Sequence, residues 1–316
     1  MIVIYKKDVI TLNKTIIHCV STAPIFMAGA DQSKPEFRAA SIKGNMRFIW
    51  RAVQRAENIE ELRECEGKLF GNAFGGKDTK ASDMRIRIEN ATDIKGRQNM
   101  APHRGLNEYE GVNKQRHITP QAFQEGNKFD VVITSFVVEE QHKNYVRLFV
   151  LTCLLYGFGR RSRKGFGTVE ITGIELIGEN EIDYSLYGMA DNLNAISKFG
   201  AKYSFIDGDN PEITVEGGGS EKYPYIENIR IAGTIDALGK PGTKYFIEQI
   251  GLTAHDFNNG YSFLGGSKNR FASSVLLSTI PWGEENFRCI VTQLYCTQNL
   301  SEAERKRFYD ELDGRV

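Results

Sequence analysis

The sequence has no apolar run long enough to cross a bilayer. Its longest apolar stretch, residues 146–156, is interrupted by Arg147 and Thr152, whereas a membrane-spanning helix needs about 20 apolar residues. The first residues place apolar side chains before Lys6 and Lys7, which is the reverse of the order in a secretory signal. We therefore expect a protein of the cytoplasm with no membrane partner.

Paired cysteines are also missing. The 5 cysteines are scattered, and none forms a C-x-x-C pair or a Cys/His cluster with zinc spacing. Small, buried, reduced side chains are the simplest interpretation of such a set. We predict no metal site and no cofactor.

A nucleotide-binding phosphate loop is absent as well. No G-x-x-x-x-G-K-[ST] motif occurs, and the glycine-rich segment 157–167 follows an expected helix and precedes an expected strand. A phosphate loop has the opposite order, because loop amides and the N-terminus of the next helix must converge on the phosphate.

An overall excess of positive charge is lacking, since 40 Lys and Arg balance 40 Asp and Glu. The charges are nevertheless segregated along the chain. Residues 37–56 and 141–169 contain many cations and no acid, and a local field can arise from such segregation. Local binding of an anion such as RNA is therefore compatible with the neutral total.

The first half of the chain has the element order of a ferredoxin-like module. The expected elements are strand 11–23, a helix that Ser41 caps and whose apolar positions are 42, 46, 49, 50 and 53, strand 84–90, strand 129–138, helix 144–156 and strand 168–177. This β-α-β-β-α-β order predicts a four-stranded antiparallel sheet with two helices on one face.

Three further segments of this half carry expectations of their own. A polar helix is expected at 62–70, before a glycine-rich break at 71–76. Residues 84–90 (MRIRIEN) alternate apolar and polar side chains, so one face of that strand should be basic and exposed. The polar segment 96–120 should be mobile in the free protein and become ordered on RNA or on a neighbouring subunit.

The second half predicts a diverged second module. Expected elements are strand 226–231, helix 243–257, strands 271–279 and 287–296, and helix 301–312. No closing strand follows, but 202–206 or 212–215 could supply it. The expected class is α+β with two ferredoxin-like (RRM-like) modules, at 1–177 and 223–316. Residues 178–222 are a polar segment and linker in which Gly217–Gly219 is the best linker candidate.

The glycine-rich segment has the composition of an RNA-backbone contact. Glycine allows close approach to a ligand, and arginine forks match phosphate oxygens. Phe158 and Phe166 could stack on bases or fill the core beneath the loop. The residues concerned are Gly157, Gly159, Gly165 and Gly167, with Arg160, Arg161, Arg163 and Lys164. Further cations, Lys43, Arg47, Arg51 and Arg55, recur every four residues along the first helix, a pattern that more often marks a solvated face.

Four separated motifs recur in order along the chain: FMAGAD at 26–31, RAASIKGNMRFIWRA at 38–52, the glycine-rich segment 157–167 and RFASS at 270–274. Together they resemble the RAMP superfamily of CRISPR ribonucleoprotein subunits, and within it the first-numbered RAMP subunits of type III-B (Cmr) complexes. Ile49 and Ser274 depart from the usual pattern, where an aromatic residue and a proline are more common.

The resemblance implies an RNA-binding subunit of an antiviral, crRNA-guided complex. It implies contacts with the crRNA 3′ region or with single-stranded target RNA, and with other RAMP subunits of the Cmr complex. It also implies a binder rather than an enzyme. The RNA-binding residues expected on these grounds are Arg38, Lys43, Arg47, Arg51, Arg160, Arg161, Arg163, Lys164, Lys268 and Arg270.

Two alternatives stay open from the sequence. A RAMP endoribonuclease could use one of the dispersed histidines as a general acid–base without a metal, or it could depend on Asp31 in the segment before the first helix. One aspartate without a carboxylate cluster is little for two-metal chemistry. The other alternative is an assembly subunit whose cations contact only protein.

Overall fold

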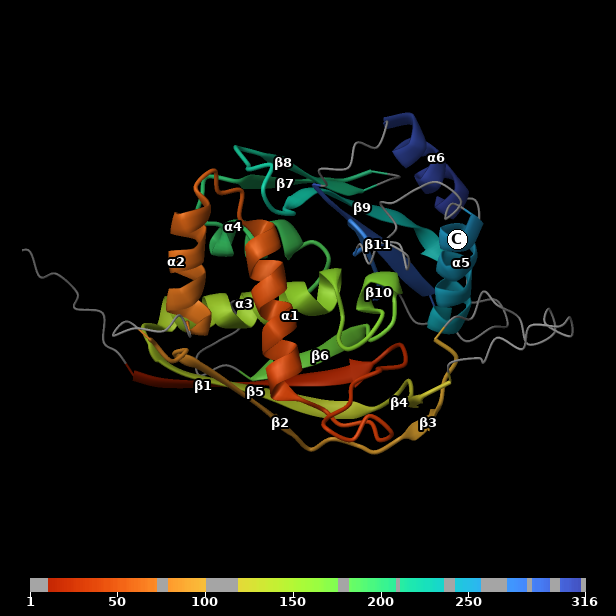
Figure 1. Ribbon diagram of the computed structural model, residues 1–316, viewed down its shortest axis with the longest axis horizontal. Helices are drawn as coiled ribbons and strands as arrows, with labels where there is room; N and C mark the ends of the chain where they lie inside the picture. Colours follow the sequence, from red (N-terminus) through yellow and green to blue (C-terminus); the bar gives the residue numbers. More distant parts are fainter. Residues whose placement is uncertain are drawn as a thin grey trace, which may run out of the picture.

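The computed structural model describes residues 11–72, 79–100, 119–175, 182–208, 211–235, 242–256, 272–282, 286–295 and 302–313. Its first sheet contains β1 (Thr11–Ser21), β2 (Met84–Glu89), β5 (Lys128–Val137) and β6 (Val169–Glu175) in the order β2-β5-β1-β6. All neighbouring pairs are antiparallel. With α1 (Ala39–Val53) and α3 (Glu139–Leu155) on one face, this is the predicted ferredoxin-like module (Figure 1).

Helix α1 buries the predicted stripe of Ile42, Met46, Ile49, Trp50 and Val53. It begins at Ala39, so the expectation that Ser41 caps it is wrong. Arg38 is the N-cap residue and caps without a side-chain hydrogen bond. The Ser41 amide already donates to the Arg38 carbonyl at 3.0 Å, which places Ser41 inside the first turn. The polar helix expected at 62–70 is α2 (Ile59–Phe70).

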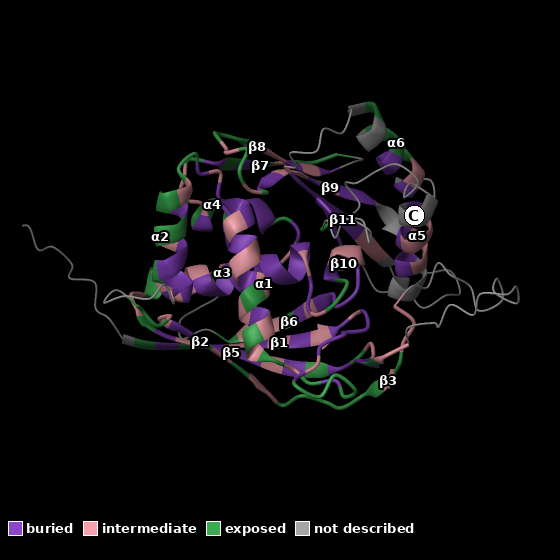
Figure 2. Ribbon diagram, in the orientation of Figure 1, coloured by how far each residue is buried: buried purple, intermediate pink, exposed green. Residues whose placement is uncertain are grey.

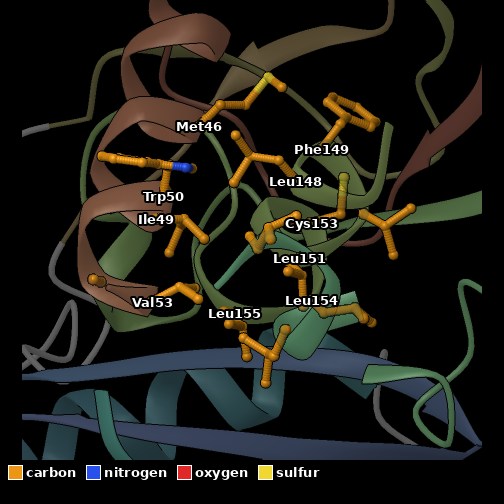
Figure 3. Packing of buried hydrophobic residues seen from close by; sticks show 14 of the residues in the cluster. Met46, Ile49, Trp50, Val53, Leu148, Phe149, Leu151, Cys153, Leu154 and Leu155 are labelled. Carbon is orange, nitrogen blue, oxygen red and sulfur yellow. The ribbon is translucent and has the colours of Figure 1, made fainter. Parts of the chain in front are cut away.

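Helix α3 is buried on nearly every side because it lies between two sheets. It packs against β1, β5 and β6 of the first sheet and against β10 (Val275–Trp282) and β11 (Asn286–Leu294) of the second. Figure 3 shows its Leu148, Leu151 and Leu155 among α1 side chains such as Ile49 and Val53. In Figure 2, α3 is buried along most of its length whereas α2 has an exposed side. This position explains why the sequence of α3 is apolar almost all round.

The second sheet has the order β10-β11-β9-β8-β7, with β9 at Ile226–Ile235, β8 at Glu212–Glu216 and β7 at Lys202–Ile206. Helices α5 (Gly242–Asp256) and α6 (Glu302–Asp313) complete the predicted β-α-β-β-α order. Strand β8 pairs antiparallel with β9, in the position that a closing strand takes in the first sheet. The missing strand therefore precedes the module in the sequence, as one of the two expected possibilities, and β7 extends the sheet further.

Segment 178–222 is more than a connection. Its α4 (Met189–Ile196) packs against α3, and its β7 and β8 belong to the second sheet. One hydrophobic cluster joins Ile17 and Ile49 of the first module to Ile229 and Ile290 of the second. The division at 178–222 stays a prediction, but these strands extend the second sheet to residue 202.

A short ladder that the sequence did not predict joins β3 (Lys95–Arg97) and β4 (Gln121–Phe123). These strands flank the segment expected to be mobile, most of which (101–118) lies outside the described residues. Among the helices of the described part, none is long and apolar enough to cross a membrane.

Candidate functional site

The glycine-rich loop leaves the C-terminus of α3 and enters β6, as predicted, and contains the short 3-10 helix η1 (Ser162–Lys164). Backbone hydrogen bonds close its base, because the Phe158 amide donates to the Gly167 carbonyl at 2.8 Å. Two more fix it to the segment after β1: Arg160 N–H to the Phe26 carbonyl at 2.9 Å, and Gly167 N–H to the Pro24 carbonyl at 3.0 Å. The loop is therefore held along its length rather than attached only at its ends.

Two glycines make this close packing possible. Gly159 has φ +88°, and a Cβ there would lie 2.6 Å from the Phe26 carbonyl oxygen. Gly167 has φ +71°, and its Cβ would lie 1.8 Å from the Phe158 carbonyl oxygen. Both positions combine a left-handed backbone with no room for a side chain. At these positions the glycines are needed for the shape of the loop.

The two loop phenylalanines fill the core, which settles the alternatives left open by the sequence. Phe158 and Phe166 are each only 1% exposed. Phe158 stacks on Phe149 of α3 with ring centroids 5.8 Å apart, and Phe166 lies 5.1 Å from Phe26. Neither ring is available to a base in this conformation.

Arg160 and Arg161 of the loop are exposed, and Arg163 is half-buried. The Arg160 guanidinium donates to the Gln32 side chain and that of Arg161 to the Met100 carbonyl. Arg163 donates to the Ser273 carbonyl and lies 4.8 Å from the centre of the Phe48 ring. Arg160 and Arg161 thus remain open to solvent, while Arg163 partly joins the loop to α1 and the second module.

Lys164 does not match the expectation of a surface side chain. Its amino group is buried and has no hydrogen-bond partner among the described residues. Burial, and then the charges of Arg161 and Arg163, lower the pKa of Lys164 to about 7. The amino group is buried because the loop contacts the second sheet. The next residue, Gly165, donates its amide to the Leu277 carbonyl of β10 at 3.0 Å, and η1 packs against that strand.

The basic stripe of α1 is engaged with neighbouring elements. The Lys43 amino group donates to the Met84 carbonyl at 3.0 Å, and its pKa is lowered by burial and by Arg47. Arg47 and Arg51 both bind the carboxylate of Glu66 on α2, whose side chain is 4% exposed. Burial opposes ionisation of Glu66, but hydrogen bonds from Arg51 and Arg47 outweigh it and lower the pKa of Glu66.

The loop reaches α1 on a different side from this stripe. Asn45 donates its side-chain amide to the Gly157 carbonyl at 3.0 Å. Asn45 and Arg47 point roughly 200° apart on a helix with about 100° per residue. The loop therefore folds back on α1, but Arg47 and Arg51 face α2 instead of extending the loop surface.

Arg38 lies near the loop instead. It is exposed, and its guanidinium is 3.5 Å from the Ala28 carbonyl oxygen. Gln32, the partner of Arg160, donates to the Gly29 carbonyl at 2.6 Å. Arg38 and Arg160 are thus both attached to the segment between β1 and α1. Lys268 and Arg270 lie outside the described residues.

The residues considered for nuclease chemistry bind neighbouring side chains or backbone, or are buried. Asp31 is exposed and accepts from the Ser33 amide at 2.9 Å, and hydrogen bonds from Ser33, with a smaller effect of Lys34, lower the pKa of Asp31. His18 lies between Asp130 at 2.7 Å and Glu175 at 3.1 Å. His142 is buried. The described part of the chain contains no group of three or more His, Cys, Asp or Glu that could hold a metal. His103, His117 and the side chain of His255 lie outside it.

Gln32 and Glu66, which bind arginines, and Asn45, which binds the backbone of the loop, were not predicted from the sequence. Each is a common polar residue, and its partner lies 15 to 128 positions away. Helical spacing relates residues three or four apart, so no local pattern could have identified these pairs.

Comparison with known proteins finds similar sequences. The model of the RAMP superfamily matches residues 19–170. CRISPR system Cmr subunit Cmr1-2 from Pyrococcus furiosus is 44% identical over 62 residues, which are 19% of this chain and 33% of that protein. The alignment therefore spans about a third of that relative's length.

Solved structures match over nearly the whole fold. The crystal structure of Cmr1 from Pyrococcus furiosus in its apo form matches with a TM-score of 0.55 at 18% identity, covering 96% of this chain and 97% of that one. A chain of the type III-B Cmr-beta complex bound to cognate target RNA matches with a TM-score of 0.55 at 10% identity, covering 96% and 99%. Residues 19–170 are thus similar to the RAMP superfamily, and the chain is similar over 62 residues to a Cmr-type RAMP subunit.

Proposed function

We propose that this protein is an RNA-binding subunit of a type III-B CRISPR complex. It would contact the crRNA 3′ region, the single-stranded target RNA, or both, together with other RAMP subunits, in antiviral defence in the cytoplasm. The Cmr1 likeness and the Cmr-beta complex bound to target RNA support this assignment. The two modules at 1–177 and 223–316 are part of the proposal.

One observation carries the proposal: exposed guanidinium groups on a rigid support. Within the described residues, neither Arg38 nor Arg160 forms an ion pair with a carboxylate, and their hydrogen bonds go to neutral oxygens. No described carboxylate therefore pairs with either guanidinium group, and the backbone hydrogen bonds of the loop hold Arg160 in place. Preorganised guanidinium groups suit phosphate oxygens.

Contacts of this kind read the RNA backbone and not its sequence. We assign Arg38, Arg160 and Arg161 to the primary phosphate contacts, with Arg163 beside them. The side chains of Arg47 and Arg51 are 40% and 41% exposed. Their guanidinium groups could therefore contact a further phosphate while they remain paired with Glu66. Lys43, Lys164, Lys268 and Arg270 remain predicted contacts.

The test replaces Arg38, Arg160 and Arg161 with alanine in the full chain. Loss of three phosphate contacts should flatten the dependence of log K on log salt by about two units, since each contact on a single strand contributes roughly 0.7. Binding should weaken alike for RNAs of different sequence. Fluorescence anisotropy at several salt concentrations measures both effects.

A matched control replaces Arg63, Lys68 and Lys198, which are exposed cations on other parts of the surface. Equal losses in the control and in the test variant would mean that net charge alone matters. Binding without cleavage is the second part of the proposal. Degradation of labelled RNA that Asp31→Ala abolishes would replace it with the nuclease alternative.

A further inference from the structure

The outer face of the first sheet is not covered by any helix of the described residues. Helices α1 to α4 lie on the other side of this sheet, and no helix of the described residues covers the face below it in Figure 1. Strand register places Leu12 opposite Phe136, and Arg85 opposite Thr134. Phe136 is 62% exposed and Leu12 is 58% exposed. An aromatic ring this exposed on a central strand has no role in the core.

Cations lie on both strands that neighbour this ring: Lys14 of β1 and Arg85 of β2 pair with Thr134, two residues from Phe136, and Arg87 pairs with Val132. Lys14, Arg85 and Arg87 are exposed on the same face, as the alternation in 84–90 predicts. Arg87 pairs with Glu89 at 3.2 Å, and exposed pairs of this kind are weak. Lys14 and Arg85 form no ion pair within the described residues. Lys14 and Arg85 therefore bring positive charge, not paired with a described carboxylate, to the face that carries Phe136.

A groove of about 790 Å³ runs along this end of the sheet. Lys14, Arg85, Arg87 and Phe136 line it on the outer face, and the groove extends round the edge strand β2 to Lys43 of α1, whose amino group binds the Met84 carbonyl. The acid in its lining is Asp83, which is already paired with Lys80 at 3.3 Å. The groove thus combines four cations, one paired acid and an exposed aromatic ring.

We propose that this groove is a second RNA-binding site, in which Phe136 stacks on an unpaired base and Lys14, Arg85 and Arg87 contact the backbone. The proposal rests on the proposed function, but it uses a different surface from the glycine-rich loop. A positively charged groove with an exposed aromatic ring is the arrangement that binds single-stranded nucleic acid. A partner protein would have to cover Lys14, and lysine is depleted at protein interfaces.

The aromatic contact is tested with Phe136→Ala. Loss of one stacked base should weaken binding of a 20-nucleotide single-stranded RNA about 5- to 150-fold. Phe136→Tyr keeps the ring and should restore affinity. Ile94→Ala removes another exposed apolar side chain, 48% exposed and elsewhere on the surface, and should leave affinity unchanged.

The ionic contact is tested with Arg85→Ala/Arg87→Ala, which should flatten the salt dependence by about 1.4 units. The matched control is Arg63→Ala/Lys68→Ala. RNA that carries 5-iodouridine should crosslink to the peptide containing Phe136 in the wild type, and less so in the double variant.

The outcomes separate the two proposals. If both groove variants bind RNA like the wild type while the Arg38/Arg160/Arg161 variant is weakened, the groove proposal is overturned and the proposed function stands. A wild-type chain that binds no RNA overturns both. Groove variants that bind RNA normally but no longer join the larger complex would show that a protein docks there, which also overturns the RNA assignment.

Discussion

His142 should make the protein less stable in mild acid. Its ring is 4% exposed and lies between two hydroxyls, with Nε2 2.9 Å from Thr15 Oγ1 and Nδ1 2.7 Å from Ser135 Oγ. Burial, opposed in part by Glu139, lowers the pKa of His142 from 6.5 to about 4. The folded protein therefore holds this ring neutral at a pH where the unfolded chain already binds a proton.

The sign and size of the effect follow from proton linkage. Because the pKa is lower in the folded state, the contribution of His142 is complete above pH 6.5 and is lost as the pH falls towards 4. A shift of one pKa unit corresponds to about 1.4 kcal/mol, so lowering the pH from 7 to 4.5 should remove about 2.5 kcal/mol from the free energy of unfolding. Below pH 4 this group should cause no further loss.

Urea unfolding of the wild type and of His142→Gln at pH 7 and pH 4.5 measures the effect. The glutamine keeps a polar partner for both hydroxyls but does not titrate, so this variant should lose about 2.5 kcal/mol less than the wild type over the same interval. Carboxylates such as Glu66 and the raised pKa of His18 act alike in both proteins and cancel in the difference. Equal losses in the two proteins would refute the assignment of a buried, neutral His142.

Two further substitutions test the positions of the cations and of the loop. Glu66→Gln should lower stability by about 1–3 kcal/mol, because two half-exposed guanidinium groups lose their hydrogen-bonded carboxylate. It should also strengthen RNA binding by releasing Arg47 and Arg51; unchanged or weaker RNA affinity would place the α1 stripe away from RNA. Gly167→Ala should lower the melting temperature sharply, since its Cβ would meet the Phe158 carbonyl at 1.8 Å, whereas Gly44→Ala, with no atom within 4 Å, should stabilise α1 by about 1 kcal/mol. Thermal melts of the two glycine variants, side by side, measure the contrast, and equal shifts would contradict the close packing of the loop.

Periodic segments could be predicted because the spacing of their apolar residues reflects the layers against which they pack. The stripe of α1 and the alternation of 84–90 each follow from one neighbouring layer, and the all-round apolarity of α3 follows from two. The order of these segments then determined the first module. The closing strand of the second module could only be offered as a choice, because β8 precedes the strand it pairs with and its short alternating pattern resembles that of β7.

The residues that position the candidate site were harder to predict. Lys164 looks like its exposed neighbours in the sequence, and only the contact of Gly165 with β10 shows why its amino group is buried. Glu66 belongs to a helix whose polarity indicated a solvated surface, yet its carboxylate is enclosed by two arginines of α1. Charge segregation indicated where cations are concentrated, but tertiary contacts decide which of them can reach a ligand.

The position of the loop depends on both modules. Its stem continues from α3, which lies between the two sheets, and Ser278 of β10 donates to the Leu154 carbonyl at the end of that helix. Arg163 and Gly165 add hydrogen bonds to the Ser273 and Leu277 carbonyls. Because the loop is hydrogen-bonded to elements of both modules, a shift of the second module would also move Arg160 and Arg161. The second sheet thus supports the phosphate-binding surface proposed for the first, although the sequence presents them as separate repeats.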